Sequence, residues 1–158
     1  MRVGWGFDAH PLDGDPPLRL GGAVVSDSLG VSATSDGDVL AHAVTDALLG
    51  ACVLGDIGQH FPSDDPSFQG VDSMSLLRQA VAMAAAAEWG PVHVDVTVVA
   101  EHLRISPHRD AIRVGVSEAM GLEVGDVSVK ATTTDGLGFI GKGEGVAAIA
   151  VVTVEALS

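Results

Sequence analysis

The sequence predicts an α+β fold, a single two-layer domain over residues 1–158 in which about three helices cover one face of a mixed β-sheet. Three observations lead to this prediction. Three segments repeat apolar residues at helical spacing, and several shorter segments have strand patterns. The last strand, residues 146–155, is apolar on both faces and needs cover on both sides. Because the three helices can cover only one face, we expect the other face to contact further copies of the chain.

The chain begins with a predicted strand at residues 2–10, which Pro11 closes. A turn rich in Asp, Gly and Pro follows at residues 13–17. Residues 18–25 are expected to form a short hairpin that is broken at Gly21-Gly22.

The first helix is expected to begin at a cap formed by Ser35 or Asp36 and to run to about Leu54, with Gly55 as its left-handed C-cap. Residues 55–66 then form a long loop dense in Gly, Pro and Asp, and such loops are often functional. Its acids could bind a divalent cation or sugar-like hydroxyls, although a solvated acidic surface loop would have the same composition.

The second helix is predicted over residues 72–89, capped by Asp72 or Ser73 and stopped by Gly90-Pro91. Residues 92–100 follow as a strand whose valines share one face.

A second loop, residues 100–106, precedes a third helix, which opens with Ser106-Pro107 and ends at Gly121. The strand at 126–132 leads into a loop, residues 132–145, that contains five glycines, three threonines and a lysine. Backbone amides and hydroxyls in such a loop are available to bind phosphate.

Composition argues against several classes of function. The net charge of −13 disfavours binding to nucleic acid or to anionic membranes. No apolar run reaches the roughly 18 residues of a membrane span. Cys52 is the only cysteine and the N-terminus shows no targeting pattern, so we expect a cytoplasmic protein without internal disulfides.

Three residues could form a metal site of the catalytic zinc type. Asp8 and His10 are two positions apart in a strand, so their side chains share one face. His42 from the first helix would be the third ligand and would leave one position open. Asp46, one helical turn later, could accept the other ring N–H of a metal-bound His42. A polar strand end and an ordinary polar pair in a helix stay open as alternative interpretations.

Seven motifs follow one another along nearly the whole chain. They are Gly-Phe-Asp-x-His at 6–10, Ser-Asp-Gly-Asp-x-x-x-His at 35–42, Thr-Asp-Ala-Leu-Leu-Gly at 45–50, Leu-Gly-Asp-Ile-Gly at 54–58, Phe-Pro-x-x-Asp-Pro at 61–66, Val-Lys-Ala-Thr-Thr-Thr at 129–134 and Gly-x-Gly-Glu-Gly at 141–145. Together they resemble the 2-C-methyl-D-erythritol 2,4-cyclodiphosphate synthase family of the non-mevalonate isoprenoid pathway.

The resemblance implies a homotrimer with active sites between adjacent subunits. It implies conversion of 4-diphosphocytidyl-2-C-methyl-D-erythritol 2-phosphate into the 2,4-cyclodiphosphate with release of CMP, the reaction of a metal-dependent, cyclising phosphorus–oxygen lyase. Zinc, or another divalent transition metal, would bind Asp8, His10 and His42. Mg²⁺ or Mn²⁺ would bind the substrate diphosphate near Asp135.

The family's further site residues carry over by position. Those expected near the ribose and the methylerythritol are Asp56, Ile57, Gly58, Phe61, Pro62, Ser63, Asp64 and Asp65. Those expected at the cytosine are Ala100, Leu103, Arg104, Ile105 and Ser106. Those expected at the phosphates are Thr34, Ser35, Thr132, Thr133, Thr134, Asp135, Phe139 and Lys142, with Thr133 stabilising the transition state.

The chain departs from the family pattern at several of these positions. Thr34 stands where a histidine that assists at the phosphates is usual, Lys142 where arginine is common, and Ser63 where an acid is frequent. Two other functions are compatible with the residues: a zinc-dependent hydrolase of nucleotide diphosphates, and a non-catalytic trimer that binds cytidine nucleotides.

Overall fold

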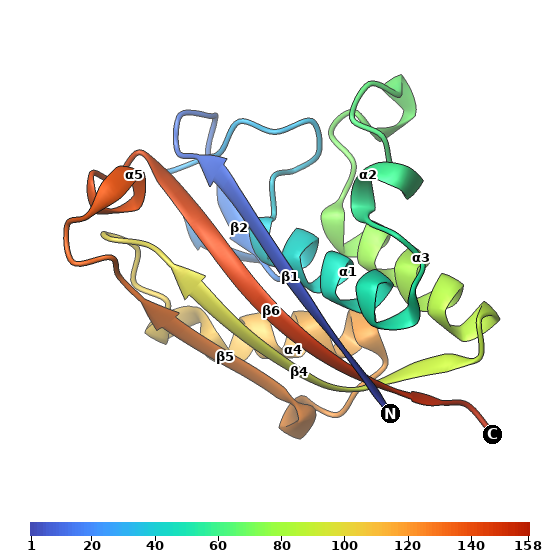
Figure 1. The fold of residues 1–158 in the computed structure, drawn as a ribbon. Helices are drawn as coiled ribbons and strands as arrows, with labels where there is room; N and C mark the ends of the chain where they lie inside the picture. Colours follow the sequence, from blue (N-terminus) through green and yellow to red (C-terminus); the bar gives the residue numbers. More distant parts are fainter.

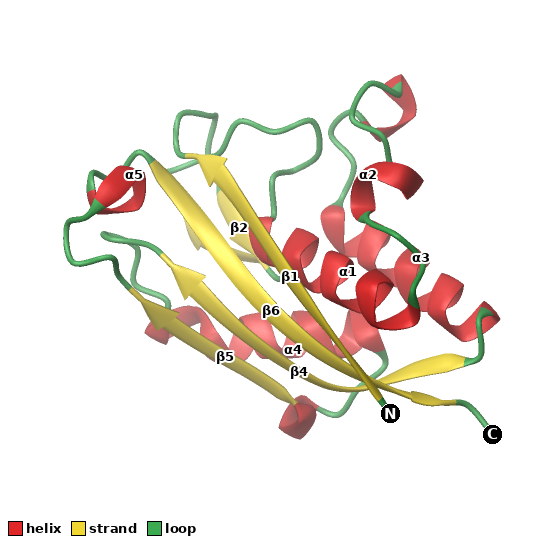
Figure 2. Cartoon of the chain, viewed as in Figure 1, coloured by secondary structure: helices red, strands yellow, loops and turns green.

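The structure, a computed structural model, describes all residues from 1 to 158 as two layers, a β-sheet and a layer of helices (Figures 1 and 2). The sheet has the strand order β1-β6-β4-β5. Its strands are β1 (Arg2–Pro11), β4 (Trp89–Val99), β5 (Val127–Thr132) and β6 (Gly145–Ala156). β6 pairs antiparallel with both β1 and β4, whereas β5 pairs parallel with β4. The sheet is therefore mixed, as predicted, and a separate two-stranded hairpin is formed by β2 (Leu18–Leu20) and β3 (Ala23–Ser26).

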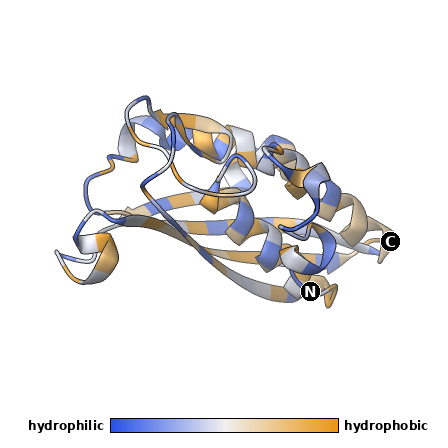
Figure 3. Cartoon of the chain, turned by 90° about the horizontal axis from the view of Figure 1, so that it is seen from above, coloured by the Kyte–Doolittle hydropathy of each residue, from blue (hydrophilic) through white to orange (hydrophobic).

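Three long helices lie on one face of the sheet, as the turned view in Figure 3 shows. They are α1 (Val39–Cys52), α3 (Ser73–Ala86) and α4 (Arg109–Met120). α1 packs on β1 and β6, and α4 packs on β5. Single-turn helices are α2 (Ile57–His60) and α5 (Gly138–Gly141), and 3₁₀ turns lie at Pro66–Phe68, Ser106–His108 and Val124–Asp126. No helix is both long and apolar enough to cross a membrane.

The opposite face of the sheet has no helical cover within this chain. Val3, Trp5 and Phe7 of β1 point to that face and remain 64%, 62% and 47% exposed. The rings of Trp5 and Phe7 stack with their centroids 6.3 Å apart. This apolar strip lies on the sheet face that we expect to contact further copies of the chain.

The other side of β1 touches α1 backbone to backbone, because glycines alternate with the exposed residues. A Cβ atom on Gly4 would lie 1.8 Å from the carbonyl oxygen of Ala47, so no side chain fits there. Asp8 and His10 continue this helix-facing side of the strand beyond Gly6. The close packing therefore aims both side chains at the first turn of α1.

Asp38, rather than Ser35 or Asp36, is the N-cap of α1. Its fully buried carboxylate accepts the N–H of Ala41 at 3.0 Å. The same carboxylate accepts the N–H groups of Gly21 at 3.0 Å and of Gly22 at 2.8 Å, and so ties the β2–β3 turn to the helix. Burial raises the pKa of Asp38 more than these three donors lower it.

Other predicted boundaries also need correction. Val53 in the left-handed conformation, not Gly55, is the C-cap of α1. α3 ends three residues earlier than predicted, so Gly90-Pro91 does not stop it, and β4 already begins at Trp89 and includes Gly90-Pro91. Ser106 starts a 3₁₀ turn and caps no helix, because no side-chain bond is made there. The loop predicted at 55–66 contains α2, because the Asp56 carboxylate caps that turn by accepting the N–H of Gln59.

Candidate active site

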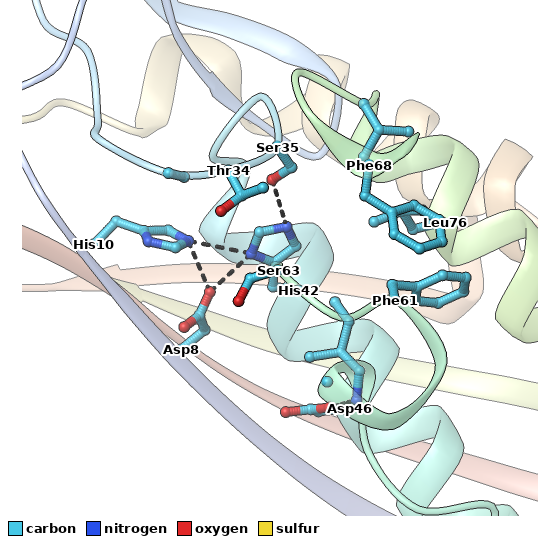
Figure 4. Close-up of a pocket in the computed structure, with 14 residues that line it drawn as sticks. Asp8, His10, Thr34, Ser35, His42, Asp46, Phe61, Ser63, Phe68 and Leu76 are labelled. Carbon is cyan, nitrogen blue, oxygen red and sulfur yellow. Dashed lines mark hydrogen bonds and ion pairs between the residues drawn. The ribbon is translucent and has the colours of Figure 1, made fainter. Parts of the chain in front are cut away.

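Three donor atoms from β1 and α1 meet beside the edge of the sheet (Figure 4). Asp8 Oδ2 lies 2.9 Å from His42 Nδ1 and 3.0 Å from His10 Nε2. The two imidazole nitrogens are 3.1 Å apart. The structure therefore brings together the three residues that the sequence predicted as metal ligands.

These donors fit a metal ion. With tetrahedral zinc bonds of about 2.0–2.1 Å, neighbouring ligand atoms are about 3.3–3.4 Å apart, close to the separations observed here. The side chains of Asp8, His10 and His42 are 28%, 17% and 12% exposed, so one side of the cluster is accessible. Burial raises the pKa of Asp8, but hydrogen bonds and charge from both histidines outweigh it and hold that pKa well below its usual range. Asp8 therefore offers a carboxylate, and the cluster could hold a divalent cation.

The second ring nitrogen of His42 faces away from the cluster. His42 Nε2 lies 2.9 Å from Ser73 Oγ and 3.1 Å from Ser35 Oγ. Asp46 does not bond to it, contrary to the prediction, because Asp46 Oδ1 accepts the backbone N–H of Ile57 at 2.8 Å. Asp46 thus holds the start of α2 instead. The contact from Ser73 was not predicted, since the sequence marked this residue only as a possible helix cap.

The cluster opens into a cavity of about 380 Å³, which is large enough for a small ligand. One wall is apolar, and there the rings of Phe61 and Phe68 meet edge to face at 5.6 Å (Figure 4). Predicted site residues that line the cavity, besides the three donors, are Thr34, Ser35, Ile57, Gly58, Phe61 and Ser63. Apolar lining residues that the sequence did not single out are Ala33, Phe68, Val71 and Leu76.

Four predicted residues of this region do not line the cavity. Asp56 caps α2 as described, and Asp65 caps the next 3₁₀ turn by accepting the N–H of Ser67 at 2.9 Å, which lowers the pKa of Asp65. Pro62 and Asp64 contribute no lining atoms either. Within one chain, two acids of the predicted loop therefore shape the backbone rather than face the cavity.

A second cavity, of about 610 Å³, lies at the carboxyl ends of β4 and β5. Predicted residues that line it are Ala100, Leu103, Arg104, Ile105, Ser106, Thr132 and Thr133. Glu101 also lines it, and its buried Oε2 has no hydrogen-bond partner. No residue lines both cavities, so one chain carries the predicted site as two separate parts.

The remaining predicted residues come after Thr133 in the sequence. Asp135 is exposed and accepts a hydrogen bond from Thr133 Oγ1 at 3.1 Å. Thr134 and Phe139 line a shallow apolar hollow beside α5, and Lys142 is exposed.

Comparison with known proteins gives consistent results. The sequence model of the YgbB family matches residues 1–155. The 2-C-methyl-D-erythritol 2,4-cyclodiphosphate synthase of Halorhodospira halophila is 51% identical over 156 residues, which covers 98% of this chain and 96% of that protein. A solved 2C-methyl-D-erythritol-2,4-cyclodiphosphate synthase in its CDP-bound form has a TM-score of 0.88 at 35% identity, covering 98% of this chain and 100% of its own. The bifunctional IspDF from Campylobacter jejuni has a TM-score of 0.96 at 38% identity over 99% of this chain and 42% of its own length.

Proposed function

This chain belongs to the YgbB family, and on that premise we propose that it converts 4-diphosphocytidyl-2-C-methyl-D-erythritol 2-phosphate into 2-C-methyl-D-erythritol 2,4-cyclodiphosphate and CMP. The reaction would supply isoprenoid precursors, and residues 1–158 would form one synthase domain. The observation that carries the proposal is the convergence of Asp8, His10 and His42 at the mouth of a cavity.

The chemistry needs no nucleophilic side chain. An oxygen of the substrate's own 2-phosphate would attack the β-phosphorus of the diphosphate, and the new P–O bond would close the ring. The bond from the β-phosphorus to the bridging oxygen would break, so that CMP leaves with that oxygen. The protein would mainly have to position the reacting groups and neutralise their charge.

Asp8, His10 and His42 would hold zinc or another divalent transition metal. When bound, this ion and a Mg²⁺ or Mn²⁺ ion near Asp135 would supply positive charge to the phosphates, which a protein of net charge −13 otherwise repels. Thr133 would donate its hydroxyl hydrogen bond to the diphosphate in the transition state.

Substrate binding would divide between the two cavities. The first cavity, with its Phe61 wall, would bind the methylerythritol phosphate, with Thr34 and Ser35 at its polar rim. The second, lined by residues 100–106 with Thr132 and Thr133, would bind the cytidine diphosphate. The other carried-over residues, Asp56, Pro62, Asp64, Asp65, Thr134, Phe139 and Lys142, keep their proposed roles in an assembled site.

A homotrimer would complete the site. The cytidine cavity of one subunit would meet the Asp8, His10 and His42 cluster of its neighbour. This arrangement would explain why the two parts of the predicted site are separate in one chain. The exposed strip of Val3, Trp5 and Phe7 supports this assembly, because apolar side chains on an uncovered sheet face are stabilised by contact with another subunit. A cytoplasmic location is part of the proposal, and the buried, unpaired Cys52 is compatible with it.

The test is product analysis with Zn²⁺ and Mg²⁺ present. ³¹P NMR of the reaction should show the cyclic diphosphate together with CMP in equal amounts. Open-chain phosphates would identify a hydrolase instead. Binding of CDP without turnover, together with turnover in Thr34→His, would identify a nucleotide-binding protein.

A further inference from the structure

A partly buried series of hydrogen bonds leads away from the cluster of Asp8, His10 and His42. His42 Nε2 contacts Ser73 Oγ at 2.9 Å, and Ser73 Oγ makes a short hydrogen bond to Asp36 Oδ1. Ser73 is fully buried at the first position of α3, whereas Asp36 lies in the loop before α1. This series of hydrogen bonds therefore joins three segments that are distant in sequence.

The loop that carries Asp36 is fixed against the segment before α3. The N–H of Asp36 donates to the carbonyl of Val71 at 3.0 Å, and the N–H of Gly70 donates to the carbonyl of Thr34 at 2.7 Å. Asp36 Oδ1 also accepts the N–H of Asp38 at 3.2 Å. The carboxylate is thus held in place by backbone bonds, independently of the histidine.

Asp36 determines which atom donates in each hydrogen bond of this series. A carboxylate only accepts hydrogen bonds, so the single hydroxyl proton of Ser73 must point to Asp36. The Ser73 oxygen is then left as an acceptor for the proton on His42 Nε2. In the metal-free protein the Asp8 carboxylate, 2.9 Å from His42 Nδ1, favours a proton on that nitrogen. A metal ion needs the Nδ1 lone pair, so a metal-bound His42 carries its one proton on Nε2, where the Ser73 oxygen accepts it.

Ser35 does not impose the same direction. Its Oγ lies 3.1 Å from His42 Nε2 and accepts the backbone N–H of Gly37 at 3.2 Å. Ser35 Oγ also lies 3.2 Å from Ser73 Oγ, but no carboxylate contacts Ser35, so its hydroxyl proton can rotate and the residue can act as donor or acceptor. Ser35 is therefore a natural control for Ser73.

We propose that Ser73 and Asp36 are positioning residues that stabilise the Nε2–H tautomer which His42 must adopt when Nδ1 binds a metal ion. The proposal rests on the proposed function, because a free Nδ1 lone pair matters only if the cluster binds a cation. Residues that hydrogen-bond to a metal-bound histidine typically contribute 10- to 100-fold to affinity.

The test uses Ser73→Ala, Asp36→Asn and the control Ser35→Ala in the full-length protein. Asparagine keeps an oxygen that can accept the N–H of Asp38. Its NH₂ group can donate to Ser73 Oγ, which reverses the direction of that hydrogen bond. Zn²⁺ affinity is measured by competition with a chelator, and the absorption of the Co²⁺-loaded protein reports the ligand geometry. The Nε2–H group of His42 and its hydrogen bond are read from ¹H–¹⁵N correlations of the imidazole in the Zn²⁺-loaded protein.

We expect Ser73→Ala and Asp36→Asn to bind Zn²⁺ about 10- to 100-fold more weakly and to lose the hydrogen-bonded Nε2–H signal of His42. Ser35→Ala should change both readouts much less. Lower thermal stability with unchanged Zn²⁺ affinity and an unchanged Nε2–H signal would show a merely structural role and overturn the proposal, as would equal losses in Ser35→Ala. If the wild-type protein itself binds no Zn²⁺, the metal site of the proposed function fails as well, so the two failures are distinguishable.

Discussion

Gly6 of β1 lies directly against the carbonyl oxygen of Ala43 in α1, so that a Cβ atom on this glycine would be only 2.0 Å from that oxygen. His42 is the residue before Ala43, and Asp8 is two residues beyond Gly6. The absence of a side chain at one position thus sets the distance between two metal-ligand candidates.

Gly6→Ala should push α1 away from β1 and separate His42 from Asp8. We expect a loss of about 1–3 kcal/mol in the free energy of unfolding, the usual range for overpacking, and weaker Zn²⁺ binding. Gly50→Ala is the matched control, since no atom lies within 4 Å of its added Cβ and alanine favours the helix by about 0.5–1 kcal/mol. Unfolding curves and chelator competition measure both effects. Wild-type Zn²⁺ affinity in Gly6→Ala would contradict the role given to this contact.

His42→Ala should abolish Zn²⁺ binding and turnover while the fold survives. The reason is that His42 is only partly buried and the aliphatic core packs without it. Metal content after dialysis and the far-ultraviolet circular dichroism spectrum provide the measurements. A variant that fails to fold would show that the cluster is needed for stability.

Trp5→Glu should dissociate the proposed trimer, because it places a charge on the uncovered apolar face of the sheet. Light scattering coupled to gel filtration reports the mass. Val114→Glu, at a similarly exposed apolar position on α4 in the helical layer, should leave the assembly intact. If both variants keep the wild-type mass, the strip on β1 is not the contact surface.

Asp135→Asn should raise the Mg²⁺ concentration needed for half-maximal turnover. Asp135 has a φ of 52°, and asparagine tolerates this left-handed conformation well, so the backbone should not change. An unchanged Mg²⁺ titration would count against a role for this carboxylate in binding the second ion.

The ion pair between Asp95 on β4 and Lys130 on β5 predicts a pH dependence of stability. Burial raises the pKa of Asp95, but hydrogen bonds from Lys130 and Ser128 outweigh it, so the pKa is lowered on folding. The stabilisation is therefore present above the unfolded pKa of about 3.9 and is lost as pH falls through the folded pKa. Lys130→Met should cost at most about 1 kcal/mol at pH 7, because the two side chains are 34% and 53% exposed. Urea unfolding from pH 7 toward pH 3 should show this difference shrink, and a constant difference would exclude the mechanism.

The metal site could be predicted partly from local periodicity and partly from the family resemblance, which joins His42 to Asp8 although 34 residues separate them. Strand alternation puts Asp8 and His10 on one face whatever surrounds them, and the motifs placed His42 at the start of a helix. The apolar face of the sheet was predictable from local periodicity, in the two-sided pattern of the last strand.

The partners of His42 could not be predicted, because they depend on how distant segments pack. Asp46 has the right helical spacing, yet α2 folds back and its first N–H takes that carboxylate. Ser73 is 31 residues from His42 and carries no local signal for this contact. The sequence did not indicate Asp38 as the cap for a similar reason. Its carboxylate also accepts N–H groups of the β2–β3 turn, which lies far from it in sequence.

The alternation along β1 has a further consequence for how this protein can change. Its even-numbered residues include the ligand candidates Asp8 and His10, and its odd-numbered residues form the exposed apolar strip. A one-residue insertion between Val3 and Trp5 would exchange the two faces of the rest of the strand, turning Trp5 and Phe7 toward α1 and the Asp8 carboxylate toward solvent. Substitutions can therefore accumulate on either face separately, whereas the length of this strand is constrained by both faces at once.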